Sequence, residues 1–186
     1  MGQVHSLAGR LLVATPQLGD PNFRRAVVLL LRHDDEGALG VILNRPLAVP
    51  TGEALPSWHD AVTPPASLFQ GGPVGLDGAL GVATLVPAAE SDSVDRLTGP
   101  FGLVDLDADP TGGLPGVTGI RVFVGYAGWS ADQLEGEVAA GDWYVLDARP
   151  GDVTTPEPQL LWRQVLRRQG GMLAIVSTFP EDPSLN

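Results

Sequence analysis

A glycine-interrupted stretch from Gly125 to Glu137, GYAGWSADQLEGE, constrains the fold of this chain more than any other segment. The β-branched run from Ile120 to Val124 leads into it and predicts a strand. The glycines allow a sharp turn that side chains would block. Ser130, followed by Gln133 three residues later, has the spacing of a helix capping box. We therefore predict a strand, a turn and a helix capped by Ser130.

The predicted helix has an apolar side and a polar flank. Leu134 belongs to the apolar stripe, and Gln133 and Glu137 lie four residues apart beside it. With Trp129 at the helix entrance, these residues predict a polar-edged pocket for a ligand or a partner. The alternative is that Trp129 is a core residue where the helix packs on the sheet.

Short apolar runs elsewhere predict a mostly antiparallel sheet. Strands are expected at Arg10–Ala14 and Ala26–Arg32, and a hairpin loop at His33–Gly37 returns the chain along Leu39–Leu43. Further strands are expected at Ala79–Val86, Leu103–Val104, Trp143–Leu146 and Met172–Ser177.

Two further helices are expected. A weak helical pattern covers Glu53 to His59. Thr155 is predicted to cap a longer helix with Pro156 at its first position, and its buried stripe is Leu161, Trp162, Val165 and Leu166. With 186 residues, the sequence predicts one α+β domain over residues 1–186: a mixed, largely antiparallel β-sheet flanked by a few helices.

Composition excludes several kinds of chemistry. The chain has no cysteine and no lysine, which removes thiolate catalysis and Schiff-base formation. Its net charge of −11 repels nucleic acid and anionic membrane surfaces, so neither is an expected partner. We see no signal peptide and no apolar run near the roughly 20 residues that span a bilayer, and we expect a cytoplasmic protein. No cofactor and no metal are expected.

A glycine turn and one arginine form a candidate anion site. The turn Gly71-Gly72-Pro73 lacks the spacing of a nucleotide-binding loop, so a plain tight turn is one interpretation. Its main-chain N–H groups could also hold an anion, with Arg45 after Asn44 adding a fork of donors.

Three other site types find little support. Ser130 could be a nucleophile at a strand-to-helix turn, but Asp132 replaces the second glycine of that motif, so capping explains it better. His33 is expected in a solvated loop rather than at a metal site. Arg163, Arg167 and Arg168 form a basic cluster, yet no helix-turn-helix pattern accompanies them.

The chain resembles the YqgE/AlgH family of bacterial proteins over nearly its whole length. The resemblance is carried by GYAGW with QLEGE, by GRLLVATP near the start, by GALGVILNRP and by GGPV, in that family's order. It implies a compact α/β-type domain. Because the family carries the label of transcriptional regulator, it also implies a regulatory role.

The sequence thus predicts a protein that binds a small anionic ligand or a protein partner, without assigning a catalytic group or an oligomeric state. The expected ligand-binding residues are Asn44, Arg45, Gly71, Gly72, Pro73, Trp129, Gln133 and Glu137. One alternative is a hydrolase-like enzyme that uses Glu137 with a bound water or metal. A second alternative is direct DNA binding by a transcriptional regulator.

Overall fold

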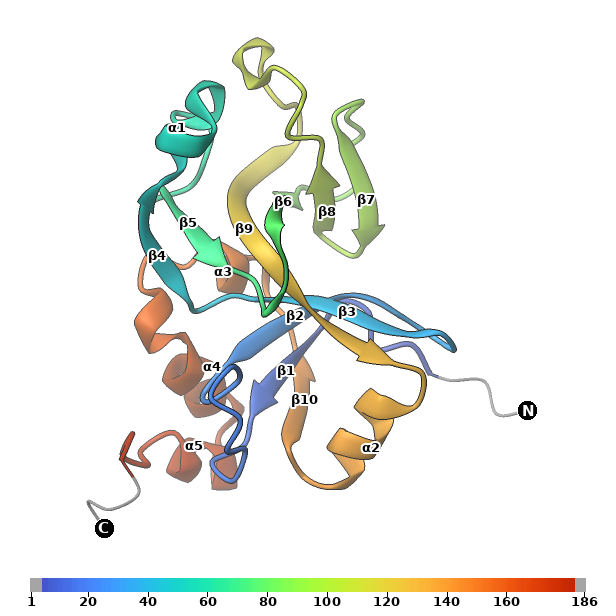
Figure 1. The fold of residues 1–186 in the computed structure, drawn as a ribbon, viewed down its shortest axis with the longest axis vertical. Coiled ribbons are helices and arrows are strands. Elements are labelled where there is room, and N and C mark those ends of the chain that lie inside the picture. Colours follow the sequence, from blue (N-terminus) through green and yellow to red (C-terminus); the bar gives the residue numbers. More distant parts are fainter. Residues whose placement is uncertain (1–4, 183–186) are drawn as a thin grey trace.

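The computed structural model describes residues 5–182, which form one curled sheet with short helices around it (Figure 1). The central strand order is β10-β1-β2-β3-β9-β6-β8-β7, and β5 joins β4 to β9. The strands are β1 (Arg10–Ala14), β2 (Val27–Asp34), β3 (Gly37–Ile42), β4 (Pro46–Pro50), β5 (Ser67–Gln70), β6 (Val74–Leu85), β7 (Val94–Thr98), β8 (Phe101–Val104), β9 (Val117–Ser130) and β10 (Trp143–Asp147).

The pairing is antiparallel except between β5 and β9, so the predicted α+β architecture with a mixed, largely antiparallel sheet is confirmed. The helices are short: α1 (Thr51–Ala54), α2 (Gln133–Ala139), α3 (Pro150–Val153), α4 (Leu161–Gln169) and α5 (Gly171–Val176). Across residues 5–182, no helix combines the length and apolar character that crossing a membrane requires.

Strand β9 is the common element of the sheet. Its first part pairs with β6 and β5, and its last four residues, 127–130, pair with β3. The predicted turn after Val124 is therefore wrong. Gly125 has a φ of +70°, a conformation that glycine adopts without strain, and it bends β9 instead of reversing the chain.

The start of α2 also differs from the prediction. Ser130 is the last residue of β9, and the residue at the N-cap position is Asp132, in a left-handed conformation with φ +61°. The Ser130 N–H donates to Gln133 Oε1 at 3.0 Å, and its hydroxyl lies 3.2 Å from the same oxygen. Ser130 therefore accepts no helix N–H group in these contacts, and Gln133 ties the end of the strand to the helix.

The two faces of the β1–β2–β3 half carry separate cores. Alternating residues such as Leu11, Val27 and Leu29 face α4, whereas Leu12, Val28 and Leu30 face α2. In Figure 1, α4 and α5 lie on one side of these strands and α2 on the other. Helices α4 and α2 therefore occupy opposite sides of one sheet layer.

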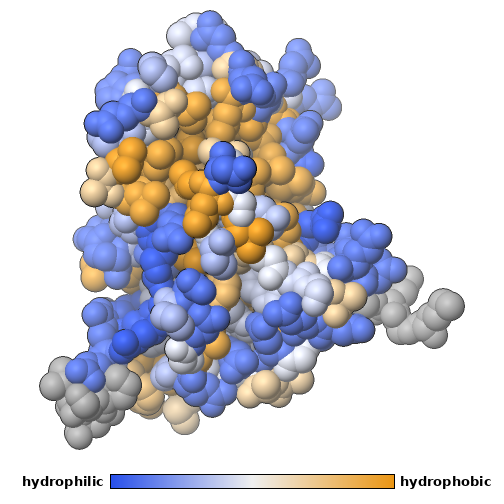
Figure 2. Space-filling model, viewed as in Figure 1, coloured by the Kyte–Doolittle hydropathy of each residue, from blue (hydrophilic) through white to orange (hydrophobic). Residues whose placement is uncertain are grey.

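The other half of the sheet has a third core around Trp58, Val122 and Val104. Figure 2 shows apolar side chains gathered over this upper half of the view. Within the first part of β6, Val74 and Leu76 are 43% and 55% exposed.

The C-terminal region shows two corrections. The long helix starts at Leu161, because Pro156 and Pro158 precede it and Pro158 opens a 3₁₀ turn (Pro158–Leu160); Thr155 is not its cap. Its predicted apolar stripe is buried as expected. The segment predicted as a final strand is α5, in which Val176 is buried while Met172 and Ile175 are 73% and 59% exposed.

Candidate functional site: an arginine-lined pocket

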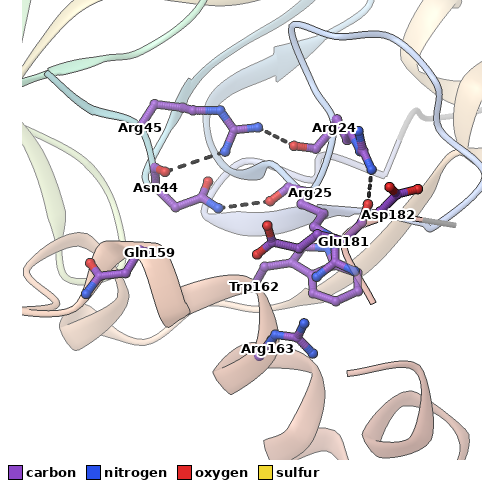
Figure 3. Close-up of a pocket in the computed structure, with 9 residues that line it drawn as sticks. All are labelled: Arg24, Arg25, Asn44, Arg45, Gln159, Trp162, Arg163, Glu181 and Asp182. Atoms are coloured by element: carbon purple, nitrogen blue, oxygen red, sulfur yellow. Dashed lines mark hydrogen bonds between the residues drawn. The ribbon is translucent and has the colours of Figure 1, made fainter. Parts of the chain in front are cut away.

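A pocket with a volume of about 640 Å³ lies between the β1–β2–β3 half of the sheet and α4. Three separate segments build it, and the residues after α5 close one side (Figure 3). Its lining combines four arginines with two acidic residues, two amides and one aromatic ring: Arg24, Arg25, Asn44, Arg45, Gln159, Trp162, Arg163, Glu181 and Asp182.

Arg25 has a backbone conformation that a non-glycine residue rarely adopts, with a φ of +54°. A left-handed conformation of this kind costs about 1–2 kcal/mol for an L-residue, so the surroundings have to hold it. The buried Asn44 side chain does this, because its amide donates to the Arg25 carbonyl at 2.9 Å and its oxygen accepts the Val27 N–H at 2.9 Å. Asn44 is therefore a positioning residue.

The Arg25 guanidinium lies 4.3 Å from the centre of the Trp162 ring, within the range of a cation–π contact. Burial lowers the pKa of Arg25, and the positive charges of Arg163 and Arg24 lower it further, while Glu181 opposes them. The pocket therefore holds like charges close together in a partly dehydrated place.

Arg45 and Arg163 extend this positive surface. The Arg45 guanidinium donates to the main-chain carbonyls of Arg24 and Asn44, and burial lowers its pKa. Arg163 donates to the Ser177 carbonyl at 2.5 Å. These hydrogen bonds end on neutral carbonyl groups, so they fix the guanidinium groups without cancelling their charge.

Glu137 and the residues predicted beside it form a different group. Its Oε2 atom accepts the indole N–H groups of Trp129 and Trp143, both at 2.9 Å, and its Oε1 atom accepts the Gln133 amide at 3.0 Å. Phe23 packs against both indole rings, at centroid distances of 6.1 and 5.6 Å. Trp129 is 6% exposed, so the structure matches the interpretation of this ring as a core residue.

The hydrogen bonds of Glu137 bear on the hydrolase alternative. Both carboxylate oxygens already accept donors, and these hydrogen bonds hold α2 on the sheet. The geometry assigns Glu137 a structural task.

The glycine turn serves close packing. A Cβ atom on Gly72 would lie 2.1 Å from the Tyr126 main chain, and one on Gly71 would lie 2.4 Å from the Gly125 carbonyl oxygen. The Gly71 N–H donates to the Val124 carbonyl at 2.8 Å, so it is not available to an anion. Gly72 and Pro73 do share a small hollow of about 90 Å³ with Arg45.

The eight predicted residues thus do not share one cleft. Asn44 and Arg45 line the large pocket, and Gly72 and Pro73 neighbour Arg45. Gly71 lies at the strand junction, while Trp129, Gln133 and Glu137 belong to the α2 side of the sheet.

Sequence reasoning missed the arginine partners of Arg45. Arg25, Trp162 and Arg163 come together only through the fold, because α4 packs on the face of the sheet that carries Leu11 and Val27. The sequence offered one indication of a basic site, because its arginines occur in pairs and clusters although the chain has a net charge of −11.

His33 is buried rather than in a solvated loop, so that prediction is wrong. It is part of β2, its Nδ1 accepts the Leu7 N–H at 2.9 Å, and its Nε2 lies 2.6 Å from Glu135 Oε1. Both ring nitrogens are engaged. Among residues 5–182, no three histidine or carboxylate side chains gather as metal ligands.

Arg121 is a further buried cation, but it lies in the core of the molecule. It donates to the carbonyls of Val153, Thr155 and Pro64 at 2.8 to 2.9 Å. Burial lowers its pKa to about 10. These contacts fasten β9 to the segment around α3.

The fold and the pocket define this class of protein as a single-domain α+β protein with a curled, largely antiparallel sheet and a basic pocket beside its main helix. Comparison with known proteins identifies the family. The chain belongs to the YqgE/AlgH family: the family model described as AlgH-like matches residues 11–174.

Relatives and solved structures agree with this assignment. A UPF0301 protein from Streptomyces coelicolor is 56% identical over 190 residues, which cover 100% of this chain and 98% of that protein. A crystal structure from Corynebacterium diphtheriae is 35% identical with a TM-score of 0.88, covering 96% of this chain and 95% of that one. The solution structure of AlgH from Pseudomonas aeruginosa is 28% identical with a TM-score of 0.68, covering 97% of each chain. These names state no reaction and no ligand.

Proposed function

We propose that this protein binds an anionic ligand in the arginine-lined pocket and that binding, rather than catalysis, is its activity. The observation that carries the proposal is the convergence of Arg25, Arg45 and Arg163 on one cavity beside the Trp162 ring. A volume of about 640 Å³ falls within the usual range of small-molecule sites.

An anion would relieve the electrostatic cost of this arrangement. Burial and mutual repulsion lower the pKa of Arg25, and burial lowers that of Arg45, so both charged forms are partly destabilised. A carboxylate or phosphate would supply opposite charge and acceptors for guanidinium donors, at about 1.5–3 kcal/mol for each charge-assisted hydrogen bond.

The charge and the composition of the chain bear on how the protein acts in regulation and on where it is located. A chain with a net charge of −11 repels DNA, and the Arg168 guanidinium is already paired with the Asp152 carboxylate at 2.6 and 2.8 Å. An effect on transcription would therefore be indirect, through the bound ligand or a protein partner. The absence of cysteine fits our proposal of a cytoplasmic location.

Thermal unfolding with a panel of phosphate, sulfate and small mono- and dicarboxylates tests the proposal. Saturation at about 100 times Kd stabilises a protein by about 2.7 kcal/mol, which corresponds to a rise in Tm of roughly 5–10 °C at this size. Sodium chloride at matched ionic strength is the reference.

Two substitutions locate the binding. Arg45→Ala and Arg163→Ala should weaken binding at least tenfold, whereas Arg32→Ala should leave it unchanged, because Arg32 is exposed in the hairpin and contacts Asp34. A panel without any anion-specific shift, or a shift that persists in Arg45→Ala, would refute an anion site in this pocket.

A further inference from the structure

The residues that follow α5 lie in the pocket as a bound peptide would. We call Ser177 to Asp182 the C-terminal tail. Arg163 donates to the Ser177 carbonyl, Arg25 donates to those of Phe179 and Pro180 at 2.7 and 2.5 Å, and Arg24 donates to that of Glu181. Three arginines thus bind four main-chain carbonyls of one short segment.

This pattern of contacts is specific for a peptide chain. A small anion offers only its own oxygens, whereas these guanidinium groups meet carbonyl groups at four positions of a segment that turns at Ser177 and Thr178 and bends at Glu181 and Asp182. The tail adds negative charge, since Glu181 favours the charged form of Arg25. In Figure 3 the tail passes beside Arg24, and the Glu181 side chain reaches toward the pocket.

The tail also divides a longer groove. Arg24, Arg25 and Glu181 line both the cavity of about 640 Å³ and a second hollow of about 100 Å³, which Thr15 and Pro16 border on its other side. Both hollows lie against the same segment, so removal of the tail would join them into one basic channel.

Beyond the buried Ser177, most side chains of the tail lie at the surface: Thr178, Phe179, Glu181 and Asp182 are exposed. The helix that leads to it, α5, has six residues and leaves Met172 and Ile175 largely exposed. The arginines, by contrast, lie within the span that the AlgH-like family model matches, residues 11–174, and the tail lies outside that span. A peptide that displaces the tail would therefore have to replace these main-chain hydrogen bonds rather than buried side-chain contacts of residues 178–182.

We propose that the ligand of the arginine pocket is an acidic peptide segment of a partner protein, and that the C-terminal tail is an internal occupant which this segment displaces. The inference rests on the proposed anion-binding function and narrows its ligand class. Because the tail is tethered beside the pocket, its effective concentration is in the millimolar range, so a free peptide competes poorly with it.

A labelled peptide with the sequence of the tail, STFPED, tests the proposal by fluorescence anisotropy with the full chain. Glu181→Arg places a positive charge beside Arg24 and Arg25 and should release the tail. We expect the peptide to bind this variant at least tenfold more tightly than the unsubstituted chain. Glu36→Arg, the same substitution in the exposed β2–β3 turn, is the matched control and should bind like the unsubstituted chain.

Two further measurements make the outcome decisive. In the Glu181→Arg background, Arg24→Ala with Arg25→Ala should reduce peptide binding at least tenfold, and an STFPQN peptide without the carboxylates should also bind more weakly. Equal peptide affinity for the Glu181→Arg and unsubstituted chains, or binding that survives loss of both arginines, overturns the inference.

A titration with inorganic phosphate separates this inference from the function on which it rests. If phosphate stabilises the protein in an Arg45-dependent manner while the peptide fails to bind either chain, the anion site stands and the peptide inference is wrong. If neither phosphate nor peptide binds, both proposals are wrong.

Discussion

Replacing Glu137 with glutamine distinguishes a structural carboxylate from a catalytic one. The substitution keeps the shape of the side chain and removes its negative charge. In the native protein, one oxygen accepts two indole N–H groups and the other accepts the Gln133 amide. A glutamine can turn its oxygen toward the indoles, but its amide nitrogen then faces the amide nitrogen of Gln133.

The hydrogen bonds of Glu137 determine how much unfolding free energy the substitution should remove. A hydrogen bond to a charged group contributes about 1.5–3 kcal/mol and a neutral one about 0.5–1.5, so each indole contact loses roughly 1 kcal/mol. Loss of the Gln133 contact adds up to about 1 kcal/mol, and partial exposure of Glu137 reduces the total. We expect a loss of about 2 kcal/mol in unfolding free energy, or about 4–8 °C in Tm for a domain of this size.

Differential scanning calorimetry and urea unfolding measure the change. Glu36→Gln, in the exposed β2–β3 turn, is the control and should shift Tm by less than about 1 °C. Near-UV circular dichroism should also change, because Trp129 and Trp143 lose their shared acceptor. An unchanged Tm for Glu137→Gln would refute the structural role and return Glu137 to the catalytic candidates.

Two further predictions concern close packing and pH. Gly72→Ala should lower the unfolding free energy by about 3 kcal/mol, because its Cβ would lie 2.1 Å from the Tyr126 main chain. Gly136→Ala, at a position in α2 with open space around it, should stabilise the protein slightly. Urea unfolding of both variants measures the difference. A main-chain hydrogen bond and contact with His33 lower the pKa of Glu135 from 4.5, so Glu135 stabilises the fold above that pH and the contribution is lost as pH falls below it. Glu135→Gln should therefore lower Tm more at pH 7 than at pH 3.5, and an equal difference at both values would contradict the linkage.

Local sequence patterns predicted the elements that depend on local contacts. Strand β1 has the predicted bounds, and the β2–β3 hairpin forms around the predicted turn. The buried stripe of α4 follows from its 3.6-residue periodicity. In each case the nearest residues in sequence supply the contacts that decide the structure.

The failed predictions depended on distant partners. The residues around Gly125 do not indicate that residues 127–130 pair with β3. The local sequence therefore predicts a turn at this glycine, where the structure has a bend within one strand. Strand β4 was not among the predicted strands: it begins at Pro46, which has no N–H to donate, and pairing with β5 stabilises it at the margin of the sheet. The apolar run of α5 fits a buried strand by composition, and only its packing against α4 settles its conformation.

Sequence reasoning identified only part of the candidate site. Asn44 and Arg45 were identified with the motif that contains them, yet the rest of the pocket comes from segments near both ends of the chain. Trp129 and Glu137 fitted a ligand pocket as well as a core, because a pattern of residues does not show which side of a sheet a ring will cover.

The position of β9 has a consequence for synthesis of the chain on the ribosome. Strands β3, β5 and β6 all precede residue 117 in the sequence, and each pairs with β9. A nascent polypeptide that ends before Val117 therefore exposes three strand edges that await the same partner. Completion of the fold is tied to the emergence of this one segment, and such dependence on long-range pairing slows folding.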